Sequence, residues 1–390
     1  MSYQKKAAKW MNQYPGIEDL EQKAEKRMPF VAWEYLQSGT GNEDAVRRNQ
    51  QKLSEITLLP RFMRGALNID TSTQLFGRTY GAPFGVAPVG LTGLMWPKIE
   101  LFLARMAKDY NIPYSLSTVA TQIPEDVGAL AGDMGWFQLY PPKENDLRSK
   151  LLQRASDAGF NTLIITADVP VPSRRERTKR AGLSVPPDIT PRLIWQGMMH
   201  PTWSIATLRN GLPRLKTVES YSEIKDMKAV GEFVRFKFRG NLSWEYIKEV
   251  RDLWKGPIIL KGLLHPLDVE EALKAGMDGI GVSNHGGRQF DGAPAAIEML
   301  PEIAKIVNGK AAVIFDSGIR TGLDIIRALA LGADFVLMGR PFVYGVSALG
   351  QYGGDHTTEI FLDDLKNNMG QLGVETIAQV KNLKAAPVHG

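Results

Sequence analysis

The chain has 390 residues, of which 44% are hydrophobic and 23% are charged, as in an ordinary folded protein. It contains no cysteine, which excludes disulfides, thiolate nucleophiles and zinc–thiolate sites. Its net charge of +5 fits nucleic acid, anionic lipid or acidic substrates as partners, and equally a mildly basic solvated surface.

The amino-terminal part, residues 1–80, contains two helical patterns, at 17–26 and 29–37, followed by an irregular stretch. We expect it to form a helical cap that contributes to the mouth of the domain behind it. The first residues lack the apolar core of a secretory signal, and no stretch reaches the ~18 apolar residues needed to span a bilayer. These features predict a cytoplasmic protein.

Eight short apolar runs follow, each bounded by Gly or Pro, as in buried parallel strands. They occupy residues 83–90, 113–118, 135–140, 162–168, 257–262, 279–284, 312–318 and 335–340. Helical patterns fill the gaps, most clearly at 144–159 and 267–276. Eight such units predict a closed (β/α)8 TIM barrel of the α/β class. The alternative is an open doubly wound sheet, but the Gly-rich turn after its first strand is missing.

We expect a single domain over residues 1–390. Its expected parts are the cap at 1–80, the barrel at 81–168 and 243–355, an insertion at 169–242, and a carboxyl-terminal helix and tail at 356–390. The insertion lies between strands four and five and is far longer than an ordinary connection, which predicts either a functional or a disordered segment.

Polar side chains cluster at the carboxyl ends of seven of the eight strands, where barrel enzymes carry their active sites. They are Ser117, Gln138, Tyr140, Thr166, Asp168, Lys261, Ser283, Asn284, His285, Asp316 and Arg340. Any one of them alone is typical of a solvated loop. A set drawn from seven strands predicts a site.

The last two strands end in Gly-Arg turns, DSGIRTG (316–322) and MGRP (338–341). Gly318 and Gly339 allow the backbone to approach an anion, Arg320 and Arg340 supply charge, and a helix begins after each turn. The loops after strands seven and eight are the usual phosphate site of this fold. The sequence therefore predicts a cofactor that carries a phosphate.

The sixth strand leads into SNHGGRQFDG (283–292), which places His285 three residues before Arg288. A lone histidine is more often structural. Here it lies at a strand end between glycines, which pairs a base that titrates near neutrality with a guanidinium suited to a carboxylate.

This segment, together with WFQLY, TADVP, LKG, DSGIRTG and LMGRP, resembles the FMN-dependent L-2-hydroxy acid dehydrogenase and oxidase family. The family includes glycolate oxidase, mandelate dehydrogenase and the bacterial respiratory L-lactate dehydrogenase, and the resemblance covers nearly the whole chain. APVGLTGLMWP (87–97) and MHPTW (199–203) are most similar to the membrane-associated dehydrogenases, especially the lactate enzyme.

The resemblance implies catalytic roles. His285 would be the base that takes a proton from the substrate, at either Cα or the hydroxyl. Asp168 would orient the imidazole and stabilise its charged form. Arg288 and Arg175 would hold the substrate carboxylate. The remaining implied substrate-binding residues are Tyr35, Tyr140 and Val119, where Val119 replaces the tryptophan of glycolate oxidases and widens the pocket.

The resemblance also implies FMN as the cofactor, with no metal. Lys261 would lie near the flavin N1–O2 edge. Gly90 matches the dehydrogenases better than the oxidases, which usually carry alanine. The full set of implied cofactor-binding residues is Pro88, Val89, Gly90, Ser117, Gln138, Thr166, Lys261, Ser283, Asp316, Gly318, Arg320, Gly339 and Arg340.

Within the insertion, residues 174–216 combine many Arg and Lys residues with Trp, Met and Leu, against only Glu176 and Asp188. This composition suits an interfacial segment on anionic lipid. We therefore expect residues 176–216 to make peripheral contact with a membrane. The alternative is a lid over the flavin whose apolar residues pack on the barrel.

These observations lead to one principal hypothesis: FMN-dependent oxidation of an L-2-hydroxy acid, L-lactate or a larger one such as mandelate, with electrons passed to a membrane quinone or cytochrome. An oxidase that makes hydrogen peroxide and a non-catalytic FMN-binding membrane-docking protein are the alternatives. The resemblance implies a homotetramer. We also expect association with the inner face of the cell membrane and no nucleic-acid partner.

Overall fold

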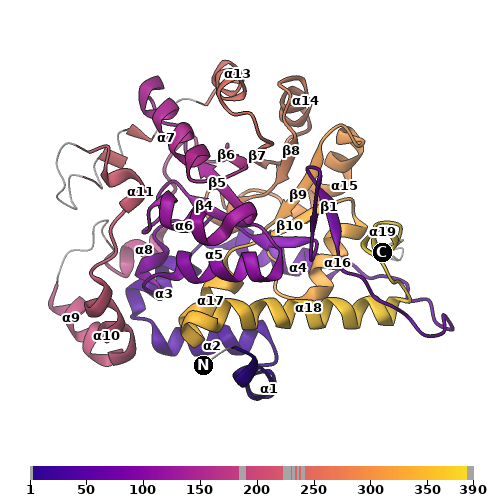
Figure 1. The fold of residues 1–390 in the computed structure, drawn as a ribbon, viewed down its shortest axis with the longest axis horizontal. Coiled ribbons are helices and arrows are strands. Elements are labelled where there is room, and N and C mark those ends of the chain that lie inside the picture. Colours follow the sequence, from indigo (N-terminus) through magenta and orange to yellow (C-terminus); the bar gives the residue numbers. More distant parts are fainter. Residues whose placement is uncertain are drawn as a thin grey trace.

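Eight parallel strands close into a barrel in the computed structural model, which describes residues 3–183, 190–222, 230, 233–234, 237–238 and 242–383 (Figure 1). Around the barrel the order is β10-β3-β4-β5-β6-β7-β8-β9. The strands are β3 (Phe84–Val86), β4 (Tyr114–Ser117), β5 (Gly135–Leu139), β6 (Thr162–Thr166), β7 (Ile258–Leu263), β8 (Gly279–Val282), β9 (Ala312–Asp316) and β10 (Phe335–Met338). The predicted (β/α)8 fold is confirmed.

The strands form where the apolar runs lie because both faces of each strand are covered, one by the barrel interior and one by the surrounding helices. These helices are α5 (Ile99–Tyr110), α6 (Pro124–Ala131), α7 (Asn145–Asp157), α13 (Trp244–Leu253), α14 (Pro266–Lys274), α15 (Ala296–Val307), α16 (Gly322–Ala330) and α17 (Arg340–Leu349). The helices predicted at 144–159 and 267–276 are α7 and α14, with ends that differ by one or two residues.

The amino-terminal end of the barrel is closed by aromatic packing under a hairpin of β1 (Thr73–Leu75) and β2 (Arg78–Tyr80). Tyr80 lies with its ring centroid 5.6 Å from that of Phe335 and 6.2 Å from that of Trp136, and all three are fully buried. This end is solid, so the chemistry is left to the opposite, carboxyl-terminal end.

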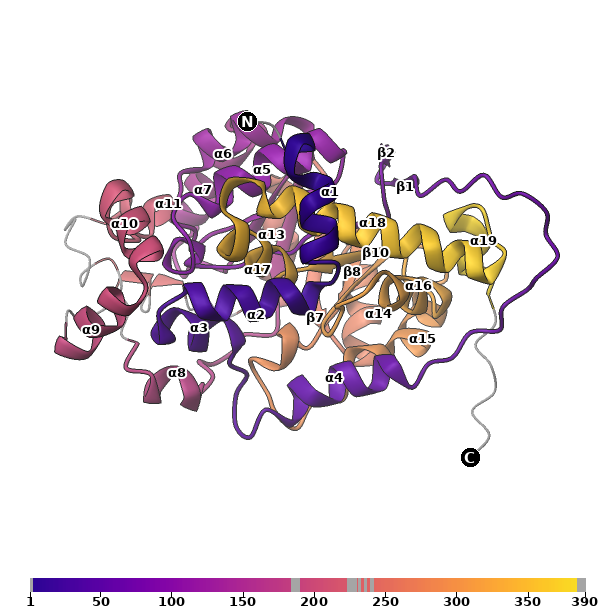
Figure 2. The ribbon, with the colours of Figure 1, turned by 90° about the horizontal axis from the view of Figure 1, so that it is seen from below.

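The cap contains four helices, not only the two predicted. They are α1 (Gln4–Gln13), α2 (Ile17–Arg27), α3 (Phe30–Gln37) and α4 (Asp44–Ser54). From α4 to β1 the chain makes a long extended excursion from the body (Figure 2). At the other end of the chain, α18 (Gly353–Leu372) begins slightly earlier than the predicted 356 and is followed by α19 (Ile377–Lys381).

The insertion between β6 and α13 contains further helices at one side of the molecule, where α8 lies beside α3 (Figures 1 and 2). They are α8 (Glu176–Arg180), α9 (Pro191–Met199), α10 (Pro201–Asn210) and α11 (Lys216–Glu219). Residues 184–189, which include Asp188 of the predicted membrane segment, lie outside the described residues, as do 384–390 of the predicted tail.

Candidate active site

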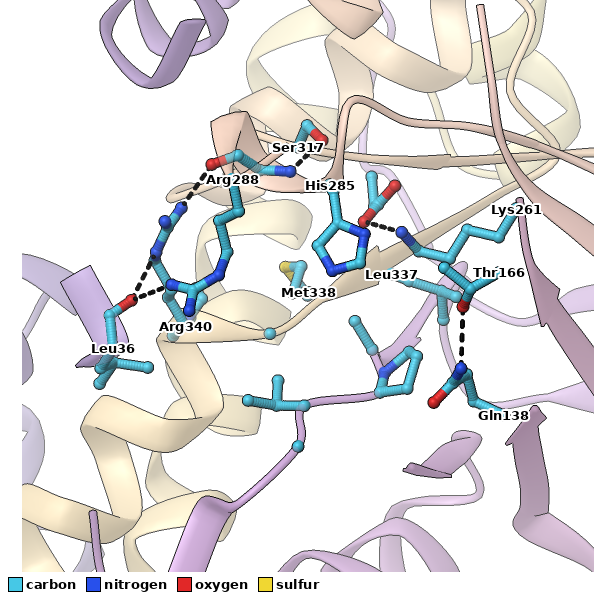
Figure 3. Close-up of a pocket in the computed structure, with 18 of the residues that line it drawn as sticks. Leu36, Gln138, Thr166, Lys261, His285, Arg288, Ser317, Leu337, Met338 and Arg340 are labelled. Atoms are coloured by element: carbon cyan, nitrogen blue, oxygen red, sulfur yellow. Dashed lines mark hydrogen bonds and ion pairs between the residues drawn. The ribbon is translucent and has the colours of Figure 1, made fainter. Parts of the chain in front are cut away.

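A pocket lies at the carboxyl ends of the barrel strands and brings together most of the predicted site (Figure 3). The predicted residues that line it are Tyr35, Pro88, Val89, Gly90, Val119, Gln138, Tyr140, Thr166, Arg175, Lys261, His285, Arg288, Asp316, Gly318, Arg320, Gly339 and Arg340. Three predicted residues lie behind this lining and hydrogen-bond to it: Ser117 to Gln138, Asp168 to His285, and Ser283 to Lys261.

The lining also contains residues that were not predicted. They are Leu36, Ala87, Gly286, Ser317, Ile319, Leu337, Met338 and Pro341. Most are apolar or contribute backbone, and all except Leu337 directly adjoin a predicted residue. Their signal in the sequence is this adjacency and, for all but Leu36, their place in the motifs quoted above.

His285 is held in a strained turn that follows β8. It adopts φ 58°, and Gly287 follows at φ 76°, where an added Cβ would lie 2.6 Å from the Val46 side chain. The Ser317 hydroxyl accepts a hydrogen bond from the Gly286 N–H at 3.0 Å. A non-glycine residue in this conformation persists only where its surroundings enforce it, which is common at active sites.

Two buried amides fix this turn from below. Asn284 and Asn49 exchange side-chain hydrogen bonds, each of 2.8 Å, and Asn284 Oδ1 also accepts from the Gly287 N–H at 3.1 Å. Sequence reasoning missed Asn49, because it lies on α4, a helix that was not predicted.

The His285 imidazole is paired with Asp168, whose Oδ1 lies 2.8 Å from Nδ1. Burial would raise the pKa of Asp168, but the charge of His285 and its hydrogen bond outweigh burial and lower it. Burial lowers the pKa of His285, against the opposing effect of Asp168. An ionised carboxylate can only accept, so Nδ1 carries the proton and Nε2 keeps a lone pair.

Lys261 places a buried positive charge beside His285, across the pocket from Arg288 and Arg340 (Figure 3). Its Nζ lies 3.1 Å from Asp316 Oδ2 and donates to Ser283 Oγ at 2.9 Å. Burial would lower the pKa of Lys261, but Asp316 and Asp168 outweigh burial and raise it. The ammonium therefore remains charged.

A row of buried polar groups crosses three adjacent strands next to Lys261. Ser117 donates to Gln138 Oε1, and Gln138 Nε2 donates to Thr166 Oγ1, each at 2.9 Å. Such a row within an apolar barrel suits a ligand that has a hydrogen-bonding edge.

Arg175 and Arg288 face this pocket without a carboxylate partner in the described part of the chain. Arg175 adopts φ 41°, and its Nε donates to Ser173 Oγ at 2.9 Å. Among the described residues, the hydrogen bonds of Arg288 come from its NH1 group, which donates to the Leu36 and Ser38 carbonyls at 3.2 and 2.8 Å. Burial and the charge of Arg175 lower the pKa of Arg288. Two unpaired guanidinium groups in one pocket call for an anionic ligand.

The turns after β9 and β10 form the far end of the pocket. Gly318 adopts φ 98°, where a Cβ would lie 3.0 Å from the Asn49 carbonyl oxygen. Arg320 Nε is buried and has no hydrogen-bond partner within the described chain. An orphaned donor of this kind indicates a missing acceptor.

The MGRP motif suggested that the Arg340 side chain supplies charge to a phosphate, but backbone carbonyls already bind it. Its guanidinium donates to the carbonyls of Leu36 at 3.0 Å, Gly286 at 3.1 Å, and Gln37 and Ser38 at 3.3 Å (Figure 3). Because its side chain is already engaged, we expect the backbone N–H groups at the start of α17 to be the main donors to a phosphate.

Comparisons with known proteins identify related enzymes. The model of the family described as FMN-dependent dehydrogenase matches residues 24–386. The chain is 39% identical over 365 residues to an L-lactate dehydrogenase of Allorhizobium ampelinum, covering 93% of this chain and 96% of the relative. It is 37% identical over 364 residues to an L-lactate dehydrogenase of Pseudomonas aeruginosa, covering 93% and 95%.

Two solved structures are similar over almost their full length. The monotopic membrane protein (S)-mandelate dehydrogenase is 30% identical, with a TM-score of 0.89 over 95% of this chain and 99% of that one. A mandelate oxidase is 33% identical, with a TM-score of 0.82 over 96% and 98%.

The pocket residues fit FMN. The Ser117–Gln138–Thr166 row and Lys261 suit the polar edge of a flavin ring. The unpaired Arg320 Nε and the turn at Gly318 suit a phosphate. FMN would thus lie at the carboxyl ends of the barrel strands, with His285, Arg175 and Arg288 nearby.

Proposed function

The chain belongs to the FMN-dependent dehydrogenase family and is an FMN-dependent 2-hydroxy acid oxidoreductase, and from this premise we propose that it oxidises an L-2-hydroxy acid to the 2-keto acid. The proposed substrate is L-lactate or a larger acid such as mandelate, and the proposed acceptor is a membrane quinone or cytochrome. The observation that carries the proposal is the convergence of the His285–Asp168 pair and two unpaired arginines on one pocket.

His285 is placed to act as the base. Its Nδ1 donates to Asp168, so the lone pair on Nε2 is the one available to accept the substrate proton, from Cα or from the hydroxyl. Because burial lowers its pKa, the imidazole is neutral near pH 7. Once it has gained the proton, the Asp168 carboxylate stabilises the imidazolium.

Arg175 and Arg288 would grip the substrate carboxylate through their unused donors. Burial raises the pKa of Tyr140 to about 12, so its hydroxyl stays protonated and can donate to the substrate. Tyr35 donates to the Gly90 carbonyl at 3.2 Å, which holds its hydroxyl at the pocket. Bound FMN supplies the two-electron acceptor.

Anaerobic mixing with a panel of 2-hydroxy acids tests this proposal. L-lactate or L-mandelate should abolish the flavin absorbance near 450 nm, and the D-enantiomers should not. Persistence of that absorbance with every acid of the panel would refute the oxidation and leave the non-catalytic alternative.

We propose peripheral membrane contact through α9 and α10. Trp203 of α10 points inward, donating to the Leu94 carbonyl at 3.0 Å, and Gln196 of α9 accepts from the Val31 N–H at 3.1 Å. The inward face of α9 and α10 thus packs on the rest of the protein, as the alternative of a lid requires. The outward face exposes Ile194, Trp195, Met198, Met199, Ile205 and Leu208, which are 49–81% exposed.

Basic residues flank this outward face, among them Arg192 and Arg209, which suits anionic headgroups at the inner face of the cell membrane. None of the helices that the structure describes is long and apolar enough to cross a membrane. A similar solved protein is a monotopic membrane protein, which also supports the proposal.

An oxidase is the second candidate, since a mandelate oxidase is among the similar solved structures. Hydrogen peroxide yield per substrate oxidised, measured against reduction of a soluble quinone, separates the oxidase from the dehydrogenase.

We also propose a homotetramer. The exposed side chains of Leu59, Phe62 and Met63, on the extended segment before β1, suit contact with a second copy of the chain. Light scattering on the protein as it elutes from a size-exclusion column gives its mass and tests the proposed tetramer.

A further inference from the structure

A set of contacts outside the pocket joins two segments that each deliver a substrate-binding residue. The first, here called the cap segment, is residues 34–43 and contains Tyr35. The second is α8, which begins directly after Arg175. The two segments are far apart in sequence and lie side by side (Figures 1 and 2).

Arg177 of α8 is the centre of these contacts. Its Nε and NH2 donate to the two carboxylate oxygens of Glu34, at 2.7 and 2.6 Å. Its NH1 donates to Glu43 Oε2 at 2.9 Å. The side chains of Glu34 and Glu43 are only 9% and 17% exposed, and a bidentate pair in such surroundings is more strongly ordered than a surface ion pair.

The neighbours of Arg177 reinforce the same junction. The Glu176 carboxylate accepts from the Gly41 N–H at 2.9 Å, and the Thr178 and Ser38 hydroxyls lie 2.8 Å apart. Three consecutive residues of α8 therefore bind the cap segment. Ser38 in turn offers its carbonyl to Arg288, so the junction reaches the second carboxylate-binding arginine as well.

Arg177 does not line the pocket, and two carboxylates already balance its charge. A direct role in binding substrate is therefore excluded. Its ion pairs instead join the chain neighbours of two substrate-binding residues. Glu34 directly precedes Tyr35, and Arg177 follows Arg175 by two residues, where Arg175 is held at a positive φ.

We propose, on the basis of the proposed function, that Arg177 is a positioning residue, which through Glu34 and Glu43 fixes Arg175 and Tyr35 in register around the substrate carboxylate. The carboxylate site is then assembled from the cap and the insertion, and the Arg177 junction preorganises it.

The test compares Arg177→Gln, Glu34→Gln and the double variant with a matched control, Lys179→Gln, which removes the same charge from the exposed face of α8. With L-lactate and a soluble dye as acceptor, each single variant should raise KM about tenfold and change kcat much less. The double variant should be no worse than the singles, because one junction is lost in each. Arg177→Lys should recover part of KM, and the control should match wild type.

Two readouts do not need turnover. Trypsin should cut after Arg174 or Arg175 faster in Arg177→Gln than in the control, and the dissociation constant of oxalate, followed by the flavin spectrum, should rise about tenfold. Unchanged KM, oxalate affinity and cleavage rate in Arg177→Gln would overturn the inference, as would additive effects in the double variant. If wild type oxidises no 2-hydroxy acid, the proposed function fails, while the cleavage and oxalate results still judge the junction.

Discussion

The pairing of His285 with Asp168 sets the pH at which the base is available. Burial lowers the pKa of His285 below its ordinary value of 6.5, whereas Asp168 acts to raise it. A base must be neutral to work, so kcat/KM should fall as the pH drops through this lowered pKa, and the acid limb should lie below pH 6.5.

Asp168→Asn should therefore have two effects. It should lower kcat by about 10²-fold or more, since the imidazolium loses its stabilising charge. It should also move the acid limb to lower pH, because the group that raised the pKa of His285 is gone. The kcat/KM profile from pH 4.5 to 8 measures both. A limb that moves to higher pH would contradict the assigned pairing.

Gly90 is required for space rather than for backbone freedom. A Cβ there would lie 2.5 Å from Val119 Cγ2, and its φ is not in the left-handed region. Gly90→Ala should therefore destabilise the pocket by about 1–3 kcal/mol and weaken FMN retention. Adding Val119→Ala should restore much of the loss, as measured by urea unfolding and flavin content. Equal losses in the single and the double variant would show that the clash is not the cause.

The site residues that could be predicted are those at strand ends, because one barrel rim collects them all. His285, Lys261 and Gln138 were found this way, and the resemblance supplied roles for Tyr35 and Arg175. Asn49 and the Arg177 junction could not be found, because their partners are distant in sequence and lie on elements whose docking no local pattern encodes.

At the scale of elements, apolar runs predicted the strands well because every barrel strand is buried on both faces. The helices α1 and α4 were missed because they are largely polar, and only a narrow side of each packs on the rest. The insertion was located by its length, but its two faces could not be distinguished: Trp203 belongs to the packed side and Trp195 to the exposed side.

The exposed face of α9 predicts lipid binding that depends on apolar insertion. Wild type should sediment with vesicles of phosphatidylglycerol and phosphatidylcholine, and Trp195→Ser with Met198→Ser should lose most of that binding while keeping turnover with a soluble dye. Leu267→Ser is a matched control, since Leu267 is 62% exposed on α14, away from this face. Equal sedimentation of all three proteins would contradict membrane contact through α9.

At the scale of the whole molecule, the barrel separates stability from chemistry. Its amino-terminal end is filled by Tyr80, Trp136 and Phe335, and its carboxyl-terminal end carries charged and strained groups. The sequence predicted the chemical end from the polar residues that follow the strands, whereas the aromatic filling of the other end was not predicted. The cap and the insertion complete the mouth of the barrel. Their arrangement depends on long-range contacts such as Arg177–Glu34, which no local sequence pattern predicts.

The central claim is that His285 removes the substrate proton at a site where Arg175 and Arg288 hold the carboxylate. The most direct measurement is the anaerobic rate of flavin absorbance loss after rapid mixing with L-lactate or L-mandelate, for wild type and His285→Asn. With an intact FMN content, His285→Asn should slow this rate by about 10²–10⁴-fold or more. A variant that holds FMN and bleaches at the wild-type rate would contradict the claim.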